Sequence, residues 1–208
     1  EKPGKAWDGT TYEVKLTFLD TEELLGFLYP DLTIADNTSI QLTVDKDGRV
    51  EGNARSVFLS TGPDYKNYLK DLQLNVNNLD DVLRAGVTGS AIRLGNIEIL
   101  NNRLEMVADN NHFGLAYSFD NQTDDASKAS IQFNGEFSRD RDGLAITAQA
   151  LPSEIHDRKN QWKLESQDIT FRSGDLHIDN FRLTNGLQHL LVHGGLSSTK
   201  SDTLSVQM

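Results

Sequence analysis

The stretch WKLESQDITFRSGDLHIDNFRLTNGLQHLLVHGGLS, Trp162–Ser197, decides the fold, because apolar and polar residues alternate along most of it. A period of two is typical of half-buried β-strands, in which one face is apolar and the other faces water. Short turns at Arg172–Asp175 and Asn185–Gly186 interrupt the alternation. The stretch therefore predicts consecutive antiparallel strands joined by hairpins.

The alternation shifts once within this stretch. Leu176 and Ile178 have one parity, whereas Phe181 and Leu183 have the other. One extra residue would return all four side chains to the same face of the sheet. We therefore predict a β-bulge near Asp179–Asn180.

The same period recurs elsewhere in the 208 residues, with turn sequences DKDG and DRDG between alternating runs. The spacing of the runs predicts an all-β fold, a long antiparallel meander of about a dozen strands. The runs cover residues 12–18, 40–44, 113–119, 131–137 and 144–148.

Helix is expected in short pieces only. Thr21–Tyr29 has a capping residue, acidic residues in its first turn and a proline after its end, which together predict a helix. A second helical turn is expected within Asn78–Gly86. The polar segments 61–67, 122–128 and 153–161 are interpreted as loops within one domain.

The composition excludes several classes of function. The net charge of −11 and the lack of a Lys/Arg run argue against nucleic-acid binding and against an anionic membrane surface. No cysteine is present, so the chain forms no disulfide and no thiolate site. The densest apolar run, Leu24–Tyr29, is much shorter than the roughly 20 residues of a spanning helix.

No residue pattern predicts catalysis or metal binding. His189 and His193 lie in a strand-like run, where four residues span roughly 13 Å, too far for one ion. The segment DKDGRVEG lacks the twelfth-position glutamate of a calcium loop, so a hairpin turn is the better interpretation. Adjacent acidic residues point apart in strands and turns. We therefore expect a protein that is not an enzyme and has no cofactor and no metal.

The C-terminal quarter resembles the repeated segment of TamB-like proteins, which belong to the AsmA-like clan of cell-envelope proteins. Thr21–Val44 is similar to the same family, with a short amphipathic helix, a proline and two strands. The matching C-terminal positions are Trp162, Ile169, Phe171, Leu176, Ile178, Asn180, Phe181, Leu183, Gln188, Gly194, Leu196, Ser197, Asp202, Leu204 and Val206.

The resemblance implies a sheet curved into an elongated groove, a β-taco, with apolar side chains inside. It implies a periplasmic location in a parent protein that is anchored in the inner membrane. The implied role is phospholipid transfer, or assembly of outer-membrane proteins with an outer-membrane β-barrel partner. We interpret residues 1–208 as one groove fragment, with a repeat-like segment over about 153–208.

Phospholipid acyl chains are the expected ligand of such a groove. An alternating run also reaches the last residues, so edge-to-edge self-association of the fragment is expected as well. The candidate groove-lining residues are Phe113, Leu115, Tyr117, Phe119, Ile131, Phe133, Phe137, Ile169, Phe171, Leu176, Ile178, Phe181, Leu183, Leu190, Val192, Leu204 and Val206.

Alternation alone leaves other readings open, because a second sheet covers an apolar face as well as lipid does. One alternative is an extracytoplasmic β-sandwich that binds carbohydrate or protein, for which Trp7 and Trp162 are the available tryptophans. Another is a hydrolase on a β-scaffold with a pair of acidic residues that lie far apart in the sequence.

Overall fold

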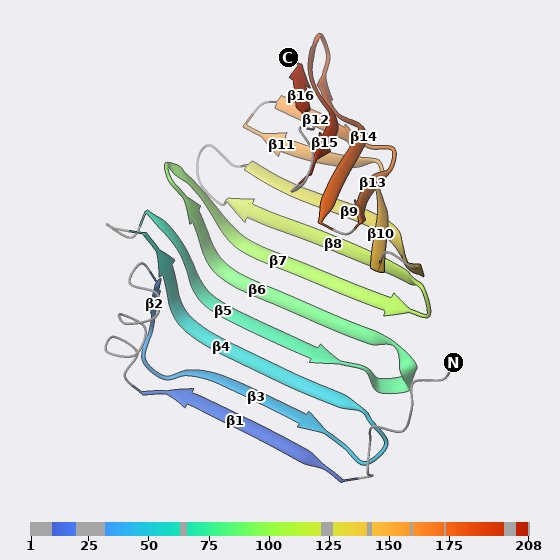
Figure 1. The fold of residues 1–208 in the computed structure, drawn as a ribbon. Coiled ribbons are helices and arrows are strands. Elements are labelled where there is room, and N and C mark those ends of the chain that lie inside the picture. The colour runs from blue at the N-terminus through green and yellow to red at the C-terminus, as the bar shows by residue number, and fades with distance from the viewer. Residues whose placement is uncertain are drawn as a thin grey trace. The chain divides into compact units, whose positions relative to one another are not determined.

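The strands of the protein form one antiparallel sheet. The computed structural model describes residues 10–19, 32–62, 66–121, 127–140, 143–158, 160–172, 174–197 and 203–207. These ranges contain a 16-stranded sheet (Figure 1), which confirms the predicted all-β meander. The predicted helix over Thr21–Tyr29 lies outside the described residues. No helix in the described ranges has the length and apolar character needed to cross a membrane.

The chain divides into two compact units, residues 1–105 and 106–208, and β7 runs across the boundary. The strands of the first unit and β7 are β1 Tyr12–Phe18, β2 Leu32–Ile34, β3 Thr38–Val44, β4 Val50–Thr61, β5 Asn67–Asn77, β6 Leu83–Leu94 and β7 Ile97–Asp109. Those of the second unit are β8 His112–Asn121, β9 Ser127–Asp140, β10 Gly143–Ala150, β11 Ser153–Asp157, β12 Asn160–Glu165, β13 Ile169–Arg172, β14 Asp175–Asn185, β15 Gln188–Leu196 and β16 Leu204–Gln207.

The DKDG segment forms the predicted hairpin turn between β3 and β4. Oδ1 of Asp45 accepts hydrogen bonds from the backbone N–H groups of Asp47, at 2.8 Å, and Arg49, at 2.9 Å. The hydrogen bond from Arg49 is the main reason why the pKa of Asp45 lies below its usual value. Gly48 has a φ of 80°, which explains the glycine at this position. This carboxylate therefore stabilises a turn.

The expected helical turn near residue 80 is present but short. A 3₁₀ helix covers Leu79–Asp81, and β6 begins at Leu83. The carbonyl side-chain oxygen of Asn78 accepts a hydrogen bond from the backbone N–H of Val50 at 2.5 Å. This contact ties the turn to the start of β4.

A line of irregular residues crosses the strands of the first unit, and we call it the first crease. Asn37, Asp71 and Asn101 have φ angles of 62°, 51° and 52°. The ladder between β4 and β5 skips the pair Val57 and Asp71. Figure 1 shows β4, β5 and β6 each bending within this unit. The strands therefore change direction together along one line.

The parity of the apolar residues also changes at the first crease. On one side Leu74 of β5 pairs with Val87 of β6, and on the other side Leu69 pairs with Ile92. Such a change is expected where an irregular residue keeps apolar side chains on one face of a bent strand. The hydroxyl groups of Thr38 and Ser56, 2.7 Å apart, hydrogen-bond each other beside this line.

A second crease crosses the second unit. β10 and β11 are successive segments of one run along β9, interrupted at Leu151–Pro152. β12 and β13 are successive segments along β14, interrupted at Ser166–Asp168. The predicted bulge is confirmed, because the register of β14 shifts between Ile178 and Phe181 and Asn180 has a φ of 54°. Interrupted runs such as these raise the strand count above the predicted dozen.

Hydrogen bonds hold the second crease together. The backbone N–H of Leu151 donates to the carbonyl oxygen of Gln132 at 2.8 Å. The backbone N–H of Ala150 donates to Oγ of Ser166 at 2.7 Å. The N–H of Asp179 donates to the carbonyl oxygen of Asp168 at 2.8 Å. The backbone groups released by the strand breaks therefore find partners, as buried polar groups require.

The predicted loop over residues 153–161 is wrong. Ser153–Asp157 and Asn160–Glu165 are strands β11 and β12, which pair with each other as a hairpin. Ile155 pairs with Trp162 and Ser153 pairs with Leu164. Polar residues outnumber apolar ones in this segment, so its composition is that of a loop. Its pairing with β9 and β14 overrides that local preference.

Gly135 of β9 should be sensitive to substitution, because an added Cβ would overlap the ring of Phe113 and lie 2.5 Å from the carbonyl oxygen of Thr147. We expect Gly135→Ala to lower the free energy of unfolding by about 1–3 kcal/mol in urea denaturation. Gly114→Ala is the matched control, since the atom nearest to its added Cβ, Oδ1 of Asn134, would lie 3.8 Å away. Equal effects of the two substitutions would contradict this packing.

Candidate functional site

The apolar residues predicted in the second unit can be placed by strand register, because residues paired directly across two antiparallel strands share a face. Leu115 and Tyr117 of β8 pair with Phe133 and Ile131 of β9. The rings of Phe113 and Phe137 lie beside them on this face, with centroids 4.7 Å apart. This part of the face is therefore aromatic and aliphatic.

The register carries the same face through β10, β13 and the start of β14. Phe137 pairs with Ile146, and Ile146 pairs with Phe171 of β13. Phe171 pairs in turn with Leu176, as Ile169 pairs with Ile178. The face thus passes from β9 to β14 without a change of side.

The bulge in β14 keeps its second half on this face. Phe181 pairs with Val192 and Leu183 pairs with Leu190, while Leu176 pairs with Leu196 on the same strand β15. The three partners on β15 have the same parity and so share a face. The register therefore places all the candidate groove residues on one face, which we call the apolar face of the second unit. β16 continues it through the pair Val192 and Val206.

Little covers this face. Phe171 is 45% exposed and Val206 is 55% exposed, and the other candidate residues are half-buried. In the described ranges, Leu164, at 1%, is the one large hydrophobic side chain that is fully buried. The other buried hydrophobic residues there are alanines, at positions 91, 108, 129, 145 and 150. A core between two packed sheets would bury many large side chains completely.

Charge is absent from most of the apolar face. By register, Arg139 of β9 and Asp157 of β11 are the charged residues on it within the described strands, and each lies near a strand end. The five histidines lie on the opposite face, where Nε2 of His112 is 3.2 Å from Oε1 of Glu136. The two faces of the sheet therefore differ sharply in polarity.

A pocket of about 820 Å³ opens on the apolar face. Its volume lies within the range of about 300–1,000 Å³ that is usual for small-molecule sites. It lies between the β11–β12 and β14–β15 hairpins and is lined by Ile155, Asp157, Trp162, Leu183, Leu187, Gln188, His189 and Leu190. Most of the lining residues are apolar, and the polar ones come from strand ends; His189, whose side chain lies on the opposite face by register, borders the pocket at the start of β15.

The sequence analysis missed part of this lining. The candidate residues do not include Ile155, which falls in the predicted loop 153–161, or Trp162, which follows that loop. Their pairing with each other, and that of Leu164 with Leu183, brings them onto the apolar face. The alternation of Trp162 and Leu164 was a usable signal. Trp162 lies half-buried among aliphatic side chains, unlike the exposed aromatic platform expected of a sugar site.

The apolar surroundings raise the pKa of one residue on this face, Tyr117. Burial raises the pKa of the Tyr117 hydroxyl, since the phenolate form is disfavoured away from water. The ring of Tyr117 lies 6.1 Å, centroid to centroid, from that of Phe119 on the same strand. Tyr117 therefore contributes to the apolar face as a neutral aromatic side chain.

The described residues do not bring together a set of groups for metal binding. Within them, no three His, Asp or Glu side chains lie close enough to hold an ion. His189 and His193 lie on β15 as expected for a strand. Comparison of the chain with protein-family models, curated proteins and solved structures gives no match.

The difference in burial between Leu164 and Leu196 predicts different costs for the same substitution. Leu164→Ala should lower the free energy of unfolding by about 2–5 kcal/mol, because it leaves a cavity. Leu196→Ala should cost less than about 1 kcal/mol, since this side chain is 50% exposed. Equilibrium urea denaturation measures both, and a similar large loss for Leu196→Ala would indicate that the apolar face is covered.

Proposed function

We propose that this chain is a non-enzymatic segment of a TamB-like envelope protein and that its apolar face holds phospholipid acyl chains. The single observation that carries the proposal is a continuous sheet face of large apolar side chains that the described residues cover only in part. Water contact with such a face is unfavourable by about 25 cal/mol per Å² of apolar surface. A ligand that covers it with hydrocarbon removes that cost.

Acyl chains fit the chemistry of the face better than polar ligands do. An acyl chain offers no hydrogen-bonding group, and the middle of this face is formed mainly by aliphatic and aromatic side chains, with the hydroxyl of Tyr117 among them. The charged residues Arg139 and Asp157 lie near strand ends, and Asp157 lines the pocket at one end of the path between β8 and β15. The pocket beside Trp162 and Leu190 gives one end of the path enough width for bulkier parts of a lipid.

The cellular setting is part of the same proposal and is supported by the sequence resemblance. The chain would act in the periplasm, within a parent protein anchored in the inner membrane. It would carry lipid between the membranes, or assist outer-membrane protein assembly with a β-barrel partner. The net charge of −11 suits an outer surface that must stay soluble while the opposite face is apolar.

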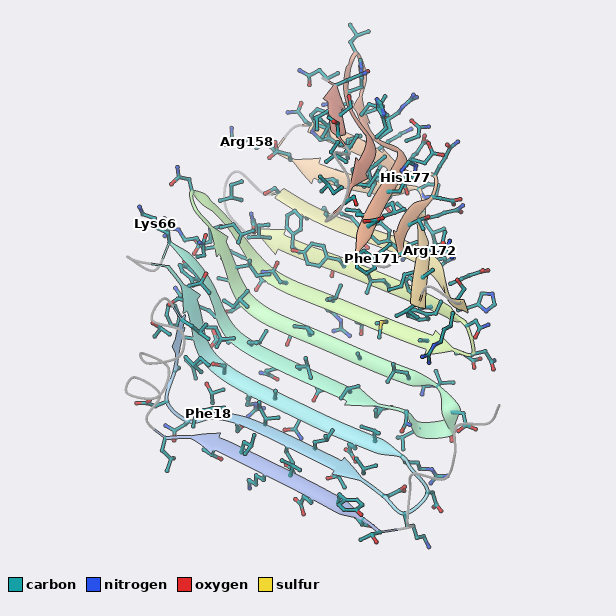
Figure 2. All side chains as sticks on the ribbon, viewed as in Figure 1. Phe18, Lys66, Arg158, Phe171, Arg172 and His177 are labelled. Carbon is teal, nitrogen blue, oxygen red and sulfur yellow. The ribbon has the colours of Figure 1, made fainter. Side chains whose placement is uncertain are left out.

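Photo-crosslinking tests the proposal by comparing positions on the two faces of the sheet. A photoreactive residue at Phe171 or Phe181 should capture phospholipid from vesicles of phosphatidylethanolamine and phosphatidylglycerol, because both positions lie on the apolar face. The same probe at Arg172 or Thr184 should capture little, since these positions face the other way. Phe171 and Arg172 are labelled in Figure 2. Mass spectrometry of the crosslinked protein gives the ratio.

A charged substitution supplies the second arm of this test. Phe181→Asp should abolish lipid capture by a probe at Phe171, because it places an unpaired carboxylate beside the lipid path. Its urea unfolding midpoint must remain close to that of the parent chain for this result to count. Equal capture on both faces, or no capture on either, would refute the proposal and favour a protein ligand for the apolar face.

A further inference from the structure

The pocket between the β11–β12 and β14–β15 hairpins contains one carboxylate, that of Asp157. Asp157 is the last residue of β11 and pairs with Asn160, the first residue of β12. It has the same parity as Ile155, which pairs with Trp162, so the carboxylate and the Trp162 ring share a face. Within the described part of the chain, the Asp157 side chain forms no hydrogen bond and no ion pair. The pocket therefore presents an unpaired negative charge beside apolar surface.

Basic side chains do not balance this carboxylate from within the pocket. The described residues that line it include no lysine and no arginine. Lys128, Lys163 and Arg182 of the surrounding strands lie on the opposite face by register. Arg158 follows Asp157 in the turn, with a φ of 56°, and is not among the lining residues. The pocket is therefore complementary to a cation.

We propose that this pocket binds an amphipathic primary amine, with the ammonium group on Asp157 and the hydrocarbon part against Trp162 and Leu190. An ammonium group donates charge-assisted hydrogen bonds to a carboxylate. A cation close to the face of a tryptophan ring is attracted by the ring as well. The volume of about 820 Å³ leaves room for a hydrocarbon chain beside the ammonium group.

The same lining disfavours other head groups. An anionic head group would meet the charge of Asp157, with no lysine or arginine in the lining to offset the repulsion. A neutral sugar or diol would leave the carboxylate without a counter-charge. Small-molecule sites commonly take affinity from apolar walls and selectivity from a few polar groups. Here the walls favour a hydrocarbon chain, and Asp157 favours an amine.

Two sources can supply this chemistry, namely a phospholipid with an ethanolamine head group and a free long-chain amine. The inference goes beyond acyl-chain binding by the apolar face, because the pocket and Asp157 carry it. Lipid bound without regard to its head group would contradict this inference and leave the proposed function intact. Failure to capture any lipid at Phe171 would contradict the proposed function alone.

The fluorescence of Trp162 reports binding in the pocket, since the chain has two tryptophans and Trp7→Phe removes the other. In this single-tryptophan chain, octylammonium should bind more tightly than octyl glucoside or octyl sulfate, each below its micelle concentration. Asp157→Asn should weaken octylammonium binding about two- to fivefold, as expected for one exposed ion pair, and leave octyl glucoside binding unchanged. Asp157→Lys should reverse the preference in favour of octyl sulfate.

Glu154→Gln is the matched control, because it removes the same charge from the same strand on the opposite face. It should leave octylammonium binding unchanged, and circular dichroism checks that each variant is folded. No octylammonium binding, binding that ignores Asp157→Asn, or an equal loss with Glu154→Gln would overturn the proposal.

Lysophospholipids with the same acyl chain distinguish the two sources. Lysophosphatidylethanolamine should bind more tightly than lysophosphatidylglycerol, and Asp157→Asn should remove the difference, if a lipid head group is the natural ligand. Equal binding of the two lysophospholipids, together with octylammonium binding that depends on Asp157, would assign the pocket to a free amine.

Discussion

The structure depends on one geometric constraint, namely that side chains along a β-strand alternate between its two faces. A chain that keeps one face apolar must hold this alternation through every strand, or correct it wherever a strand bends. The two creases are these corrections. At the second crease, Asn180 takes a left-handed conformation and the apolar residues move from even to odd positions. The alternation and the irregular residues at the bends therefore act together to keep the apolar side chains on one face.

The polarity of the sheet follows from that constraint. Charged residues occupy the alternate positions almost everywhere in the second unit, and the histidines collect there with them. This arrangement places the charge that keeps the chain soluble on one side and hydrophobic surface on the other. Because Leu164 is the one large side chain fully buried in the described ranges, hydrogen-bonded ladders contribute much of the cohesion that a packed core supplies in other domains.

Period and turn chemistry were enough to predict the all-β class and the hairpins at Asp45–Gly48 and Asn185–Gly186. The bulge near Asn180 was also predictable, because its parity change lies within one strongly alternating run. The first crease was not predicted, because Asp71 and Asn101 each take their conformation from neighbouring strands that a local pattern does not include. The strand β11 was missed for a related reason: Ile155 pairs with Ala129 of β9, which lies far from it in the sequence, as well as with Trp162 of β12.

The first crease also has a mechanical consequence. Hydrogen-bond ladders normally make a sheet stiff, yet the ladder between β4 and β5 omits Val57 and Asp71. The ladder between β5 and β6 omits Asp71 and Leu72 of β5 and Gly89 and Ser90 of β6. These gaps lie at neighbouring positions on successive strands, so they form one line across the sheet. The pairs on either side of the gaps keep their register, so the sheet changes direction along this line while the strands stay paired above and below it.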